Sequence, residues 1–344
     1  MPDYKEFRRH SNQLMISKII ITDNQLSDEI ANNYINNTIN EKLYIRRIDE
    51  NGNKYWRGFN EEYVYSYKTR KNTENNKTTS FEEFDKGIDE LSENNNLISK
   101  IFKNTYVIRK NATSNPIYVD TFIMPDINLI CILGGKDYID EPKKELYDFL
   151  ENKEIKFDEI TISHDFLLWI LWKLYQNENI SDEISLDYYE DLSVGINNEL
   201  DEEFDDSPIN IRTEGASHIL PSLPICYGLF AKKSIKYFKG DFGYKDNLFS
   251  LRINIYNEQD LSTIHILSNG CLEGLHYSEK LYLVLPFIYN LSKLVLEWKN
   301  YDVKDKYPDE EYLDKLFEKA TLDFKETKES FNELKAEYKQ KRNE

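Results

Sequence analysis

The segment from His164 to Tyr175 (HDFLLWILWKLY) constrains the fold most, because it is apolar on nearly every side of a helix. A helix that is apolar all round has to lie inside a core. Ser163 precedes it and is a plausible N-cap residue. The run is shorter than the roughly 18 apolar residues of a membrane span, and no segment of the chain reaches that length. We therefore expect a globular protein with a buried helix and no membrane span.

Alternating apolar and polar residues elsewhere predict strands, and Asn51-Gly52 between two such segments is a strong hairpin signal. The expected strands are 13–22, 41–48, 54–58, 62–69, 105–110, 117–123, 128–133, 155–162, 208–212, 232–242, 246–256 and 262–268. The expected helices, besides the buried one, are 26–38, 80–103, 141–151, 277–299 and 309–341. These elements predict an α+β fold with mixed or antiparallel sheets, packed helices and a long charged C-terminal helix. We expect an N-terminal α+β region over 1–104, an α+β core over 105–300 and the charged helix over 301–344.

The charge of the chain is strongly negative and unevenly distributed. The formal net charge is −18 over 344 residues, which argues against a simple nucleic-acid coat or a binder of anionic membranes. A local basic groove remains compatible with it, because salt screens charges beyond about 8–10 Å. Residues 178–206 contain twelve acids and neither Lys nor Arg. This stretch is either a solvated hairpin and loop or an acidic flap that meets a basic partner.

The cysteines and the N-terminus indicate the compartment. Cys131, Cys226 and Cys271 are widely spaced and lie among apolar residues, as expected of buried free thiols in a reducing environment. The first ten residues are polar and lack the apolar core of a signal peptide. We expect a cytoplasmic protein, and heavy use of Asn, Lys and Ile suggests an AT-rich bacterial or phage genome.

Motifs of catalysis are absent from the sequence. There is no P-loop, H-E-x-x-H, paired C-x-x-C or G-x-S-x-G, and Gly134-Gly135 suits a tight turn after a strand. We therefore predict no catalytic residue, no metal site and no cofactor. A metal-dependent nuclease is a third alternative, since Asp120, Asp126 and Lys136 border suitable strands, although no Glu-x-Lys follows them.

Two basic patches with interleaved aromatic residues are the candidate binding sites. Such patches can track a phosphate backbone and stack on bases. Each patch also has a purely structural interpretation: an ordinary solvated edge strand for the first patch below, and side chains that cover the edge of a core for the second. The first patch contains Lys232, Lys233, Lys236, Lys239, Lys245 and Arg252, and the second contains Arg46, Arg47, Trp56 and Arg57.

The order of elements over about 105–299 resembles the recombination-associated protein RdgC family. Residues 117–162 give strand, strand, helix and strand, and HDFLLWILW follows like the aromatic-aliphatic helix of that family. Ile211-Arg212-Thr213, Gly228 and Lys232-Lys233 stand where the family has a basic strand, a helix ending in Gly and a lysine-bearing strand. The resemblance implies a non-enzymatic, ring-shaped dimer around duplex DNA. By position it makes Arg212, Lys232, Lys233 and Lys236 phosphate contacts.

Two hypotheses follow. The first is a protein that binds duplex DNA without sequence specificity, as a homodimer, in recombination or phage–host conflict, and that is associated with the nucleoid. The alternative is an acidic interaction module, a DNA mimic or a subunit of a defence complex, which uses 178–206 or the terminal helix 309–341. An intermittent apolar stripe on that helix either docks on the body or forms a coiled-coil face. Its members are Leu313, Leu316, Phe317, Ala320, Phe324, Phe331 and Leu334.

Overall fold

A computed structural model describes residues 13–23, 25–40, 45–48, 54–57, 63–66, 100–109, 117–135, 138–195, 210–213, 221–256, 262–275 and 277–343. The chain divides into two compact units. Unit 1 combines Met1–Thr161 with Thr263–Leu296, and unit 2 combines Ile162–Ser262 with Glu297–Glu344. Helices and antiparallel strands occur in both units, which confirms the predicted α+β class. The division differs from the three consecutive regions predicted, because strands far apart in sequence pair within unit 1.

The sheet of unit 1 runs in the order β13-β1-β7-β6-β5-β3-β2, with β4 paired to β5 and β8 paired to β1. Each of these pairings is antiparallel. The strands are β1 (Gln13–Thr22), β2 (Ile45–Ile48), β3 (Lys54–Arg57), β4 (Tyr63–Ser66), β5 (Lys100–Arg109), β6 (Ile117–Met124), β7 (Leu129–Leu133), β8 (Phe157–Ile160) and β13 (Ser262–Leu267). The helices are α2 (Asp28–Asn40), η2 (Pro125–Ile127), α4 (Asp140–Asn152), η5 (Gly270–Leu272) and α7 (Tyr277–Lys299), of which residues up to Leu296 belong to this unit.

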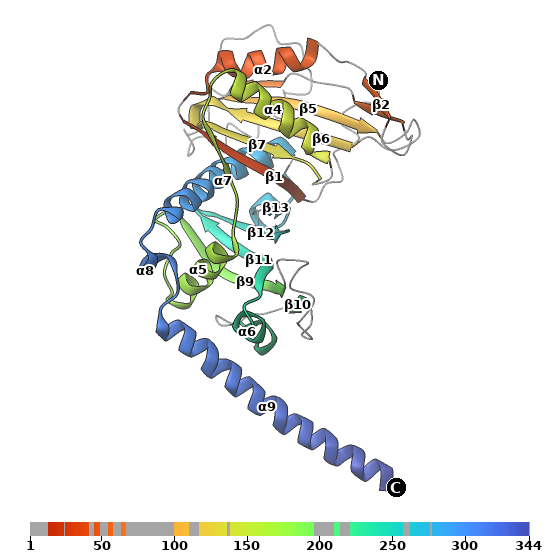
Figure 1. Ribbon diagram of the computed structural model, residues 1–344, viewed down its shortest axis with the longest axis vertical. Coiled ribbons are helices and arrows are strands. Elements are labelled where there is room, and N and C mark those ends of the chain that lie inside the picture. The colour runs from red at the N-terminus through yellow and green to blue at the C-terminus, as the bar shows by residue number, and fades with distance from the viewer. Residues whose placement is uncertain are drawn as a thin grey trace. The chain divides into compact units, whose positions relative to one another are not determined.

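The core of unit 1 lies between its sheet and the helices α2 and α4 (Figure 1). Leu146 and Leu150 of α4 are fully buried against Val119 of β6 and Ile130 and Ile132 of β7. Every residue of β7 is buried, so this strand is covered on both faces. A strand buried on both faces reads as a continuous apolar run, and LICIL is such a run.

Unit 2 contains a second antiparallel set of strands in the order β10-β9-β11-β12. Its strands are β9 (Ile184–Gly195), β10 (Asn210–Thr213), β11 (Ser234–Tyr244) and β12 (Asn247–Ile255). Its helices are α5 (His164–Tyr175), α6 (Leu223–Phe230), α8 (Val303–Lys306) and α9 (Glu310–Asn343). β9 lies within the acidic stretch 178–206, so much of that stretch belongs to a sheet.

The predicted buried helix is α5, and its predicted cap is confirmed. The hydroxyl of Ser163 accepts a hydrogen bond from the backbone N–H of Phe166 at 3.2 Å. The side chains of Phe166 and Trp169 are fully buried, and the Phe166 ring meets that of Trp298 edge-on at 5.3 Å. The indole N–H of Trp169 donates to the carbonyl of Asp305 at 3.0 Å, which satisfies its polar group inside the core.

One predicted helix is wrong where the structure describes it. Residues 100–103, expected at the end of a helix over 80–103, form the start of β5 and pair with β4 and β6. Tertiary pairing has overridden the local helical pattern here. The remainder of that predicted helix lies outside the described residues. Among the helices that are described, none has the length and apolar character needed to cross a membrane.

Candidate functional site

One face of the unit 2 sheet carries several of the predicted basic residues. Paired residues on neighbouring antiparallel strands point to the same side of a sheet. The register therefore gives successive rows across β9, β11 and β12, which we call the polar face. The rows are Ser193–Tyr237–Asn254, Asp191–Lys239–Arg252 and Tyr188–Asp241–Ser250. Arg212 of β10 pairs with Ser193 through the backbone, and its side chain lies outside the described residues.

The two cations in the middle row of the polar face lie among carboxylates. Lys239 forms an ion pair with Glu190, and the lysine side chain is only 16% exposed. The Arg252 guanidinium lies over the ring of Tyr237, 6.0 Å from its centroid. Asp191 stands directly opposite Lys239 and is 6% exposed. The row is thus of mixed charge, whereas a groove that tracks phosphates is positive.

The central residue of the third row is Asp241, which accepts hydrogen bonds. The hydroxyl of Ser250 donates to Asp241 Oδ1 at 2.5 Å, and the carboxylate is mostly buried. A hydrogen bond to Asp241, together with the charge of that carboxylate, raises the pKa of the exposed Tyr188. Two donors therefore satisfy a carboxylate on the same face as Lys239, which adds to the mixed charge of this surface.

The other predicted lysines of unit 2 are dispersed. Lys232 is exposed at the turn between α6 and β11, where its φ of 59° is left-handed. Lys233, the next residue, is 4% exposed. Lys245 is exposed at the β11–β12 turn, at the opposite end of the 11-residue strand β11 from Lys232. Lys236 lies near His164, whose pKa its charge lowers. These four lysines do not form one continuous patch.

The second predicted patch belongs to unit 1. Arg46 pairs with Trp56 across the β2–β3 ladder, and Ile45 pairs with Arg57. Arg47 is paired with Tyr55 in the same ladder. The side chains of these residues lie outside the described part of the structure. The backbone therefore pairs Arg46 with Trp56, as expected of a hairpin.

His164 has a structural partner. Its Nδ1 accepts a hydrogen bond from the backbone N–H of Ile235 at 2.9 Å, which links α5 to β11. Burial lowers the pKa of His164, and the charge of Lys236 lowers it further, against an opposing effect of Asp165. The ring is accordingly neutral at pH 7, as an accepting nitrogen requires.

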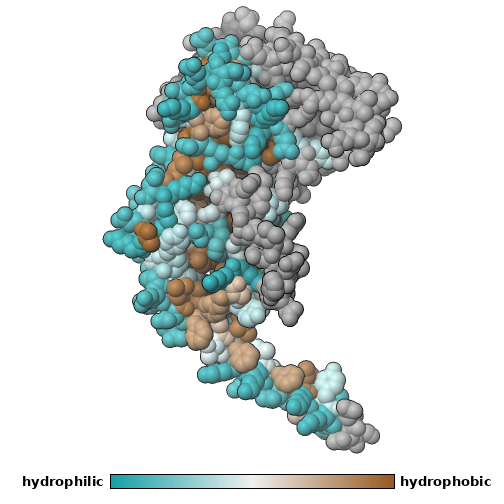
Figure 2. Space-filling view, viewed as in Figure 1, coloured by the Kyte–Doolittle hydropathy of each residue, from teal (hydrophilic) through white to brown (hydrophobic). Residues whose placement is uncertain are grey.

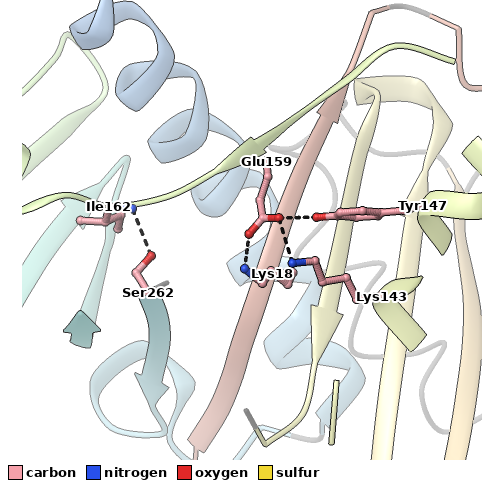
Figure 3. A network of polar contacts seen from close by, with 6 residues as sticks. All are labelled: Lys18, Lys143, Tyr147, Glu159, Ile162 and Ser262. Carbon is pink, nitrogen blue, oxygen red and sulfur yellow. Dashed lines mark hydrogen bonds and ion pairs between the residues drawn. The ribbon is translucent and has the colours of Figure 1, made fainter. Parts of the chain in front are cut away.

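In unit 1, the side chains of Lys18, Lys143 and Tyr147 meet at the half-buried carboxylate of Glu159 (Figure 3). Lys18 of β1 and Tyr147 of α4 each donate a hydrogen bond to Glu159 of β8, and Lys143 Nζ lies 3.5 Å from the same carboxylate. Burial raises the pKa of Glu159, but the hydrogen bonds from Lys18 and Tyr147 and the two lysine charges outweigh it, so the pKa lies below its ordinary value. Burial dominates at Lys18 and lowers its pKa. Because all four groups are mutually satisfied, we assign this cluster a structural role.

Residues proposed for metal-dependent cleavage do not converge. Asp120 is buried on β6 opposite Leu133, whereas Asp126 is exposed in η2. Lys136 lies outside the described residues. Within the described ranges, no three His, Cys, Asp or Glu side chains gather where a metal ion could be held.

An exposed apolar surface follows α9 and the neighbouring α6. Asp309 caps α9 by accepting from the backbone N–H of Tyr312 at 2.9 Å, and Tyr312, Leu316 and Ala320 are buried. From residue 321 onward the helix is exposed along nearly its whole length. Large apolar side chains nevertheless continue along it, and Figure 2 shows brown and tan atoms among the teal ones of this helix. They are Leu322, Phe324, Phe331, Leu334 and Tyr338.

The same surface continues onto α6. Tyr227 and Phe230 of α6 are exposed, and the Phe230 ring lies 6.1 Å from that of Phe317 on α9. Phe317 itself is exposed by 63%. We call Tyr227 and Phe230 of α6 together with Phe317, Phe324, Phe331, Leu334 and Tyr338 of α9 the helix surface. Leu322 lies outside it, because two residues along a helix turn the side chain by about 200° from Phe324. The sequence identified the stripe on the terminal helix, but the contribution of α6 required the packing of α6 against α9.

A buried polar cluster lies beneath the helix surface. Tyr312 is 0% exposed, and its hydroxyl has no hydrogen-bond partner among the described residues. The hydroxyl of Tyr189 is also buried, with no partner within the described part of the chain. Burial raises the pKa of Cys226 to about 11, so this neighbouring thiol is protonated and unreactive at pH 7. No sequence pattern indicated this cluster, because its members come from three separate elements.

Comparison with protein-family models finds no match, and comparison with curated protein sequences finds none either. The resemblance to the RdgC family, and the function that it implies, therefore stay predictions. We therefore choose between DNA binding and protein interaction from the geometry of the polar face and of the helix surface.

Proposed function

We propose that this chain is a protein-interaction module that assembles with a partner helix through the helix surface of α6 and α9. One observation carries the proposal: Phe324, Phe331 and Tyr338 are each about 60% exposed on a continuous helix. Soluble proteins rarely present a contiguous row of large apolar side chains to water unless a partner covers it. A helix of 34 residues also gains most of its stability from packing of its apolar face.

The packing of α9 supports this function. Its first turns are anchored in unit 2 through Tyr312, Leu316 and Ala320, so the exposed part is attached to a folded body. The apolar residues of the exposed part are separated by charged ones, which keeps the helix soluble before it binds. We place the function in the cytoplasm, which is supported by three cysteines, Cys131, Cys226 and Cys271, that form no disulfide.

The mass of the assembled species tests this function. Tagged full-length chain and the variant Phe324→Glu/Phe331→Glu are expressed in parallel, fixed in the cell with a lysine-directed cross-linker and sized under denaturing conditions. We expect the wild-type chain in a species heavier than one chain and the variant mainly as a single chain. Equal distributions for the two proteins would refute the proposed function.

Duplex DNA binding is the second candidate function. The observation that favours it is the pairing of Lys239 with Arg252 on one sheet face, next to the row that contains Tyr237. The carboxylates of the same face oppose it, which is why we rank it second. A gel shift with duplex DNA at low and high salt tests it, with Lys239→Ala/Arg252→Ala as the variant, because these two cations form the middle row of the polar face with Asp191. Salt-sensitive binding that this variant loses would support DNA binding, whereas no shift at low salt would exclude it.

A further inference from the structure

Apolar residues recur along α9 in a regular seven-residue pattern. Steps of four and three residues alternate along the helix, which is the spacing of the a and d positions of a coiled coil. A strict seven-residue repeat keeps one seam facing a partner over the whole length. The a positions are Phe317, Phe324, Phe331 and Tyr338, and the d positions are Leu313, Ala320, Thr327 and Leu334.

The first part of this seam lies beside other elements of unit 2, although Leu313 and Phe317 are still 47% and 63% exposed. Ala320 is buried and Phe317 contacts Phe230 of α6, whereas the seam from Phe324 onward is exposed. Thr327 is the polar member of the open seam, and its hydroxyl donates to the carbonyl of Asp323 at 2.7 Å. Because that hydroxyl is satisfied within the helix, Thr327 can enter an apolar interface without an unpaired polar group.

The charges beside the seam identify the partner. The g positions include the acids Asp323 and Glu337, and the e positions include the bases Lys328 and Lys335. In a parallel pair of helices, each g position faces the e position of the following heptad on the partner. Two copies of this helix in parallel therefore oppose Asp323 with Lys328 of the second copy. An antiparallel pair would instead oppose e with e and g with g, which brings like charges together.

We infer that α9 pairs in parallel with α9 of a second copy of this chain, through a short coiled coil that begins at Phe324. This inference rests on the proposed function and names the partner of the same surface. A helix of another protein would have to match both the phase of the aromatic seam and the separation of acids and bases on its two sides. A second copy matches both by symmetry, and the resulting interface is of the isologous type common to homodimers.

Sedimentation equilibrium of the purified full-length chain tests self-association. We expect a dimer, and we expect Phe324→Glu/Phe331→Glu to raise its Kd by at least about 100-fold, because truncating buried aromatic anchors has effects of this size. Leu322→Glu is the matched control, since Leu322 is an exposed apolar residue of the same helix at the f position, away from the seam. Its Kd should stay within about twofold of wild type. A monomeric wild-type chain, or equal weakening by both variants, would overturn the inference.

A new cysteine tests the orientation. Lys341 occupies a d position near the end of α9, so Lys341→Cys should form a disulfide-linked dimer under mild oxidation only if the helices are parallel. The wild-type chain, with its own three cysteines, is the control. A second pair of variants differs in charge alone: Ser330 is at g opposite Lys335, so Ser330→Glu should tighten the dimer and Ser330→Lys should weaken it, each by about threefold to tenfold. Absence of the disulfide, or the reverse order of the two affinities, would overturn the parallel arrangement.

The outcomes separate this inference from the function on which it rests. Suppose that the heavier species in the cell contains a second kind of polypeptide and that the purified chain stays monomeric. This result would refute self-pairing but would agree with the proposed function as an interaction module. Equal mass distributions of the wild-type chain and Phe324→Glu/Phe331→Glu in the cell would refute both the self-pairing of α9 and the proposed function. Far-ultraviolet circular dichroism and the unfolding midpoint of each variant confirm that the substitutions leave unit 2 folded.

Discussion

Replacing Glu159 by Gln should destabilise unit 1 more than replacing its partner Lys18 by Met. The Lys18 side chain is 3% exposed, whereas that of Glu159 is 23% exposed. Glu159→Gln leaves a buried ammonium without its carboxylate, and removing one partner of a buried pair costs about 3–5 kcal/mol. Because Glu159 is partly exposed, we expect the lower end, about 3 kcal/mol.

Lys18→Met has a smaller cost. It removes the charge that is expensive to bury and keeps the apolar stem of the side chain. Glu159 then retains the hydrogen bond from Tyr147 and the charge of Lys143 at 3.5 Å. We expect a loss of about 1 kcal/mol, and the double variant should lose much less than the sum of both, with a coupling of about 2 kcal/mol.

Hydrogen exchange of the β1 amides measures the effect, because it reports the opening of unit 1 separately from unit 2. The β11 amides serve as the control and should exchange at unchanged rates. The pKa of Glu159 is lowered in the folded chain, so its contribution is complete above about pH 4.3 and decreases as the pH falls toward the folded pKa. Glu159→Gln should lack this decrease. If Glu159→Gln lowers the free energy of unfolding of unit 1 no more than Lys18→Met does, the reasoning is refuted.

Three further predictions concern unit 2. Burial lowers the pKa of His164, so the contribution of the neutral ring to the stability of unit 2 should be complete above about pH 6.5 and decrease below it. The urea midpoints at pH 7 and pH 5 should therefore differ less in His164→Asn than in the wild-type chain. An unchanged difference would contradict this. Tyr312→Phe removes a buried hydroxyl that has no hydrogen-bond partner among the described residues. The free energy of unfolding should therefore stay equal or rise by about 1 kcal/mol, measured as an equal or higher melting temperature. A clear fall in the melting temperature would contradict this. Gly240→Ala should cost about 1–3 kcal/mol in urea unfolding, because its Cβ would lie 2.9 Å from the carbonyl of Tyr188; a neutral result would show that β9 yields there.

Local signals predicted much of the fold. The helix α5, its Ser163 cap and the runs that became β7 and β12 could be identified because periodicity and capping depend on neighbouring residues. The pairing of β1 with β7, β8 and β13 depends on contacts more than 100 residues apart in sequence. Such pairings leave no local pattern, so the division into two units could not be predicted.

The candidate site was predictable in its residue types and not in their surroundings. Lys239 belongs to a basic stretch of sequence, but its ion pair depends on the register of β11 against β9, which brings Glu190 beside it. Lys233 is buried because the left-handed turn at Lys232 reverses the chain between α6 and β11. The stripe on the terminal helix was visible in the sequence, whereas the point at which burial ends, after Ala320, required the structure.

The molar mass of the purified full-length chain, measured by sedimentation equilibrium over a range of concentrations, tests the central claim most directly. Self-pairing of α9 predicts a mass that rises from that of one chain, 41.0 kDa, to twice that value. It also predicts that Phe324→Glu/Phe331→Glu stays at the mass of one chain while Leu322→Glu behaves as wild type. A wild-type chain that remains at 41.0 kDa at the highest concentration would contradict it.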